Sequence, residues 1–164
     1  MSTIAISKDL IAFNRTRTLA TLDDIARQPN PAAILGFRPG PGRAHIAWQF
    51  LHVGITEELF ATERMVPGTT PAYADLVPRF KGGSTPDDDI PELSLIRKVL
   101  EESRGHLLAT LDKFSDADLP TIFPWFKERG WTFGRVLQVL CWHEGHHQGQ
   151  AHISYNLWKG AHGK

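Results

Sequence analysis

The sequence contains a single cysteine, Cys141, and has no long apolar run. One thiol cannot form a disulfide within the chain, which fits the reducing environment of the cytoplasm. No segment reaches the roughly 18 consecutive apolar residues that a membrane span requires, and residues 1–10 lack the apolar stretch of a signal peptide. We therefore expect a soluble, cytoplasmic protein with no membrane partner.

The sequence also lacks an excess of charge of either sign. Lys+Arg and Asp+Glu each number 18 among 164 residues. No strong overall field therefore attracts nucleic acid, and we expect no nucleic-acid partner. A chain of this length can bury a hydrophobic core without disulfides, and we expect one domain spanning residues 1–164.

Alternating polar and apolar residues, the pattern of a strand, are missing as well, and helical periodicity takes their place. Pro/Gly-rich stretches separate four predicted helices, at about residues 7–28, 43–65, 89–114 and 132–158. Arg15 and Thr18 interrupt the apolar stripe of the first helix. Four amphipathic helices predict an all-α fold, an antiparallel four-helix bundle with long connecting loops.

The longest of these loops, residues 66–89, contains four prolines and three glycines. A loop of this length in a compact domain is usually functional or mobile. Its Tyr73, Arg79, Phe80 and Lys81 could cover a site as a lid, and a mobile connector is an equal alternative.

Histidine is concentrated near the C-terminus, where five of the eight occur in the last 22 residues. At about 100° per residue, His143 and His147 fall in the apolar stripe of the last predicted helix, one turn apart. His52 lies in the apolar stripe of the second predicted helix. Burying an unpaired polar ring costs on the order of 1–3 kcal/mol, and a shared metal ion would offset that cost. These three histidines are the predicted metal ligands, and a bundle whose histidines only pack is the alternative.

The other polar residues near this pattern have lesser predicted roles. Thr56 and Gln150 are expected to orient bound water or a ligand ring through hydrogen bonds. Glu144, at the edge of the stripe, is a weak candidate for a general base, and a solvated surface glutamate is the favoured interpretation. Surface or hydrogen-bonding roles are expected for the remaining histidines, which are His45, His106, His146, His152 and His162.

The string HEGHH at residues 143–147 also satisfies H-E-x-x-H, the zinc signature of many peptidases. In one large class of these enzymes the third ligand is a downstream glutamate, but no Asp or Glu follows Glu144. The extended pattern H-E-x-x-H-x-x-G-x-x-H fails too, because Gln150 and Ile153 occupy its last two fixed positions. The sequence therefore favours another kind of metal site over a peptidase.

Three stretches resemble the DinB-like (DinB/YfiT-like) superfamily of metal-binding four-helix bundles. IAWQFLHV at 46–53 is similar to its second-helix segment, and TFGRVL at 132–137 to the lead-in to its last helix. WHEGHHQGQ at 142–150 is similar to its H-x-x-H-H-x-G-Q signature, with Gln148 where basic residues often appear. The resemblance implies that His52, His143 and His147 bind zinc or nickel, that His146 is a neighbour, and that the protein forms a homodimer.

The resemblance also implies two classes of function. In the first, the protein is an enzyme acting on an unknown small molecule, either by transfer or isomerisation with a low-molecular-weight thiol such as bacillithiol or mycothiol, or by hydrolysis. Three imidazoles leave a position open on the metal, as catalytic sites do, for a water or a thiolate. In the second class, the protein is a non-catalytic metal-binding or ligand-sensing bundle.

Overall fold

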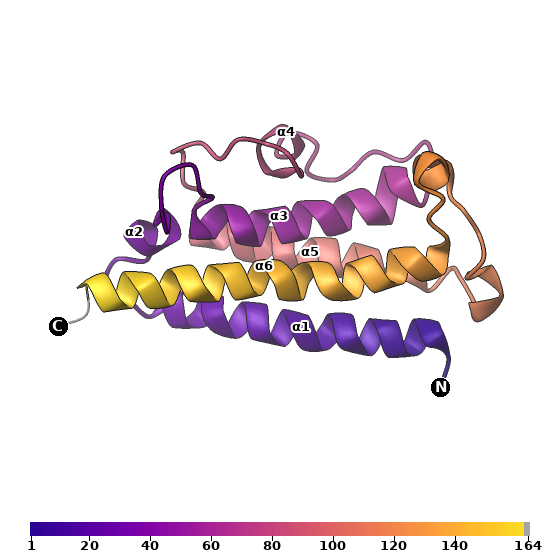
Figure 1. The fold of residues 1–164 in the computed structure, drawn as a ribbon, viewed down its shortest axis with the longest axis horizontal. Helices are drawn as coiled ribbons and strands as arrows, with labels where there is room; N and C mark the ends of the chain where they lie inside the picture. Colours follow the sequence, from indigo (N-terminus) through magenta and orange to yellow (C-terminus); the bar gives the residue numbers. More distant parts are fainter. Residues whose placement is uncertain (163–164) are drawn as a thin grey trace.

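The computed structural model describes residues 1–162 and folds them into a bundle of four long helices (Figure 1). The long helices are α1 (Thr3–Ala26), α3 (Ile46–Leu59), α5 (Leu93–Leu111) and α6 (Phe133–His162). The short elements are α2 (Pro31–Leu35), η1 (Phe60–Arg64), α4 (Val77–Phe80), η2 (Asp116–Asp118) and η3 (Pro124–Arg129). The part of the chain described contains no strand, so the predicted all-α fold is confirmed.

The helix ends follow local capping chemistry. α1 begins four residues earlier than predicted, because the Ser2 side chain accepts a hydrogen bond from the Ala5 amide and caps the helix. α5 begins at Leu93 after Pro91 and the cap residue Glu92, which lie in the segment assigned to helix from the sequence. α6 continues to His162, one turn beyond its predicted end.

The directions of the helices refine the predicted antiparallel bundle. α1 and α6 run in one direction, and α3 and α5 run in the other (Figure 1). The connection between η1 and α5, residues 65–92, is here called the crossover loop; it returns along the outer side of α3 and carries α4. A connection of this length lets α5 start beside the start of α3, so these two neighbours are parallel. α3 and α6, which pack against each other, are antiparallel.

The core is divided by a layer of four charged side chains, one from each long helix. This ionic layer consists of Arg15, Glu57, Arg104 and Glu144, and each is at most 7% exposed. Arg15 lies 2.9 Å from Glu57 and 2.7 Å from Glu144, and Arg104 pairs with the same two carboxylates. The two positive and two negative charges of the ionic layer balance, which is the condition under which buried ions are tolerated.

Apolar side chains fill the core on both sides of the ionic layer. Leu22, Ile25, Leu51, Ile96 and Tyr155 belong to the cluster on the α2 side. The cluster on the opposite side includes Ile11, Phe60, Leu107, Phe133 and Leu140. Within residues 1–162 no helix combines the length and the apolar character that crossing a membrane would need.

The end of α3 departs from regular helix geometry. η1 is a π-helical turn, and Thr62 within it has φ −114° and ψ −114°, outside the helical region. The Thr62 hydroxyl donates a hydrogen bond of 2.6 Å to the carbonyl of Glu58. π-helical turns are often found at functional sites, because they redirect side chains that a regular helix would place elsewhere. Here the turn carries Phe60 and Arg64, which line the pocket described below.

Candidate metal centre

Three histidine rings meet between α3 and α6. His52 comes from α3, and His143 and His147 come from successive turns of α6. Each ring offers one nitrogen, and these nitrogens lie within 4.8 Å of one another. The Nε2 atoms of His52 and His143 are 3.1 Å apart. Tetrahedral ligands at about 2.0–2.1 Å from a zinc ion are separated by roughly 3.3 Å, so the cluster is close to the required spacing.

The His52 ring is held in one orientation by the crossover loop. Its Nδ1 lies 2.7 Å from the carbonyl oxygen of Phe80, which can only accept a hydrogen bond. Nδ1 therefore carries the proton, and Nε2 presents its lone pair to the cluster. The Trp48 ring stacks on His52 at a centroid distance of 4.5 Å. Trp48 is itself fixed, because its Nε1 donates to the carbonyl of Arg79 and to the Ser84 hydroxyl, both at 3.1 Å.

The His147 ring is oriented by an amide relay. Its Nδ1 lies 2.6 Å from Oε1 of Gln49, so Nε2 is left free for a metal. The Gln49 amide nitrogen donates to Oε1 of Gln150 at 3.1 Å, and the Gln150 amide nitrogen lies 2.6 Å from Nε2 of His146. Gln150 therefore contacts His147 only indirectly, through the hydrogen bonds that Gln49 makes to both residues. Gln49 was not among the residues predicted from the sequence, although its position three residues before His52, on the same helix face, could have indicated it.

The electrostatic environment keeps the three rings neutral. Burial, followed by the nearby His147 and His52, lowers the pKa of His143 to about 2. Burial, followed by His52, lowers the pKa of His147 to about 3. Burial also lowers the pKa of His52, against the effect of its hydrogen bond to Phe80. Neutral imidazole is the form that coordinates a metal, so the rings are ready to bind at physiological pH.

A pocket of about 240 Å³ opens onto two of the three rings. Thr56 lines it together with His52 and His143. Gly82 of the crossover loop forms another part of the wall, and a β-carbon at this position would lie 3.8 Å from Cε1 of His52. The loop that was expected to be either a lid or a connector therefore packs closely against the site.

Glu144 does not lie where the sequence placed it. It is 2% exposed, so the expectation of a solvated surface glutamate was wrong. Its two carboxylate oxygens pair with Arg15 and Arg104 in the ionic layer. The glutamate of HEGHH is thus engaged by two buried guanidinium groups, which leaves it poorly suited to the general-base role considered from the sequence.

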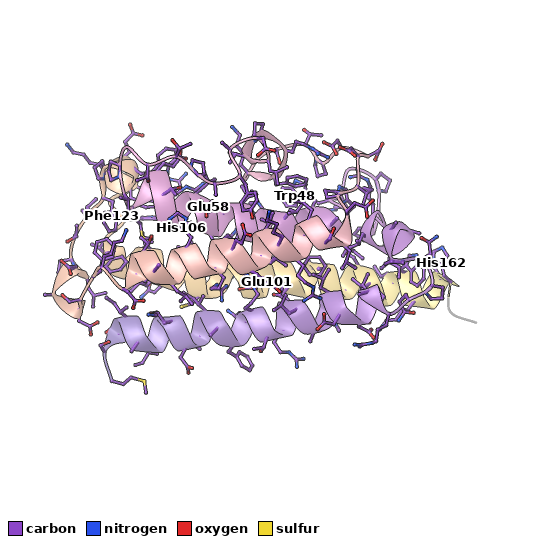
Figure 2. All side chains as sticks on the ribbon, turned by 180° about the vertical axis from the view of Figure 1, so that it is seen from behind. Trp48, Glu58, Glu101, His106, Phe123 and His162 are labelled. Carbon is purple, nitrogen blue, oxygen red and sulfur yellow. The ribbon has the colours of Figure 1, made fainter. Side chains whose placement is uncertain are left out.

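Four of the other histidines have partners along the bundle. His45 is fully buried, and its Nδ1 accepts a hydrogen bond of 3.0 Å from the Trp48 amide, which caps α3. His106 lies beside Glu58, with Nδ1 3.0 Å from the nearer oxygen (Figure 2). His146 stacks on Trp142, and His162 bonds to the Trp158 carbonyl.

A model of the DinB superfamily matches residues 10–151, a range that includes all three histidines of the cluster. No curated protein and no solved structure matches the chain significantly.

Proposed function

Because the chain belongs to the DinB superfamily, we propose that it holds a divalent metal ion, zinc or nickel, through His52, His143 and His147. The observation that carries the proposal is the convergence of three neutral imidazoles whose ligand nitrogens lie within 4.8 Å of one another. The acceptors on Nδ1 of His52 and His147 support it further. In metal-bound histidines the N–H of the second ring nitrogen characteristically donates a hydrogen bond to a carbonyl or another acceptor in this way.

We propose that the protein is an enzyme. A divalent ion held by three imidazoles can lower the pKa of a bound water or bind a thiol as thiolate. Phe80 and Gln49 fix the orientations of the His52 and His147 rings, and Thr56 lines the pocket beside His52 and His143. We favour transfer or isomerisation with a low-molecular-weight thiol over hydrolysis, and we propose that the protein works as a homodimer.

The non-catalytic metal-binding or ligand-sensing bundle is the second candidate, since three histidines alone do not require turnover. The peptidase has less support, because the glutamate of its motif is paired with Arg15 and Arg104.

Metal analysis of untagged protein tests the metal centre. We expect about one divalent ion per chain, and protein purified without stoichiometric metal that also fails to bind added zinc would refute it.

Turnover of a panel of electrophiles with bacillithiol, mycothiol or glutathione, abolished in His147→Ala, would support the enzyme. Tight metal binding with no turnover in the panel would favour the second candidate, and sedimentation analysis tests the dimer.

A further inference from the structure

The pocket beside the histidine cluster is lined by two arginines. Arg64 comes from η1 and Arg129 from the end of η3, two elements that lie against each other (Figure 1). Among residues 1–162, neither guanidinium has a carboxylate oxygen within 4.0 Å and so neither forms an ion pair. Other arginines do form such pairs, among them Arg15, Arg38, Arg79, Arg97 and Arg104. The pocket therefore has a local positive charge that the neutral composition of the whole chain conceals.

Arg64 is the deeper of the two. Its Nε is buried and has no hydrogen-bond partner within the described chain. Burial lowers the pKa of Arg64 to about 10, a direction that Glu63 opposes and Arg129 reinforces, and the group still carries its charge at neutral pH. A buried donor without an acceptor, next to a second cation, is unfavourable in the free protein. An anion bound in the pocket would attract both guanidinium groups and offset their mutual repulsion.

Aromatic rings hold both guanidinium groups at the wall of the pocket. Arg64 lies over the rings of Phe60 at 4.7 Å and Trp125 at 5.6 Å, and Arg129 lies over Trp131 at 5.2 Å. These contacts hold both cations at the wall of the pocket, and a guanidinium group has several N–H groups with which it can bind a carboxylate.

The apolar part of the lining and the size of the pocket restrict the rest of the ligand. Trp125 is 52% exposed, and with Trp131 and Val139 it offers an apolar surface near the mouth. Ligand pockets commonly measure about 300–1,000 Å³, so a volume near 240 Å³ suits a small organic molecule and not a polymer segment.

We infer that the pocket binds a small organic anion, whose carboxylate or similar group is held by Arg64 and Arg129 and whose apolar part packs on Trp125 and Trp131. His52 and His143 line the same pocket, so the other end of the molecule lies beside the metal centre. That this pocket holds the substrate rests on the proposed function, while its preference for an anion does not.

Calorimetric titration with benzoate, neutral benzamide and cationic benzamidine tests the inference, on untagged protein both zinc-loaded and metal-free. We expect benzoate to bind at least tenfold more tightly than benzamide in both forms, and benzamidine not to bind. Arg64→Gln should weaken benzoate at least tenfold, and Arg129→Gln three- to tenfold, with benzamide unaffected. Arg17→Gln, at an exposed arginine of α1 away from this pocket, is the matched control.

Equal binding of benzoate and benzamide, no binding of benzoate, or benzoate binding indifferent to both arginines would overturn the inference. If Arg64→Gln does not fold, Arg129→Gln decides alone, because Arg129 is exposed at the mouth of the pocket. Normal zinc content without arginine-dependent benzoate binding would refute the anion site and spare the metal centre. Arginine-dependent benzoate binding in a protein that takes up no zinc would do the reverse.

Discussion

Replacing Glu144 with glutamine separates a structural role from a catalytic one. The substitution keeps the size of the side chain but removes its charge, so the ionic layer changes from neutral to a net positive charge. Arg15 and Arg104 would then share the single carboxylate of Glu57. Breaking a buried ion pair by removing one partner costs about 3–5 kcal/mol. Glutamine still accepts one hydrogen bond, so we expect about 3 kcal/mol, at the lower end of that range.

For a chain of this length about 1 kcal/mol shifts the melting temperature by roughly 2–4 °C, so Glu144→Gln should lower it by roughly 6–12 °C. Circular dichroism during heating, on zinc-loaded protein, measures the shift, and elemental analysis measures the metal. Glu128→Gln, at an exposed glutamate of η3, is the control and should change stability by less than about 0.5 kcal/mol. If Glu144→Gln kept its melting temperature but lost zinc or activity, the reasoning would fail, because Glu144 would then act at the ion.

Three further predictions concern the histidine cluster. Alanine at any one of the three proposed ligands, His52, His143 and His147, should remove most of the metal found by elemental analysis, while His152→Ala, at an exposed position of α6, should leave it unchanged. Gln49→Leu should weaken zinc binding 10- to 100-fold in a chelator competition because His147 loses the acceptor that orients it, and equal affinities in Gln49→Leu and the exposed control Gln138→Leu would contradict the relay. The metal-free protein should lose stability as pH falls below about 6.5, because the pKa of His143 near 2 and that of His147 near 3 make the unfolded chain take up more protons than the folded one. Urea unfolding at pH 7 and pH 5 measures this loss, which His143→Leu should reduce, and a stability that rises on acidification would show the opposite sign.

Local periodicity in the sequence was sufficient to predict the four long helices and the inward positions of the three histidines. An i,i+4 pair on α6 fixes the separation of His143 and His147 whatever the rest of the fold does. His52 needed only the assumption that two apolar stripes face each other. Periodicity does not determine the direction of a helix, since an apolar stripe looks the same either way along the axis. The length of the crossover loop was the available signal that α3 and α5 run parallel.

The burial of Glu144 was missed for a different physical reason. The helical wheel assumed one buried stripe on α6, but that helix packs against both α1 and α3, so a wider arc of its surface is enclosed. Arg15, which interrupts the stripe of α1, carried the missing information. A cation on a buried face requires an anion opposite, and Glu144 on α6 is one of the two that provide it.

The ionic layer also fixes the axial positions of the four long helices relative to one another. If one helix slid along its neighbours by a single turn, about 5.4 Å, its charged residue would enter apolar packing without a counterion. A shift of any one helix along its axis therefore destabilises the bundle, much as one buried polar residue sets the register of a coiled coil. His52 meets His143 and His147 at a level that depends on this alignment, so four side chains outside the histidine cluster help to bring the imidazoles together.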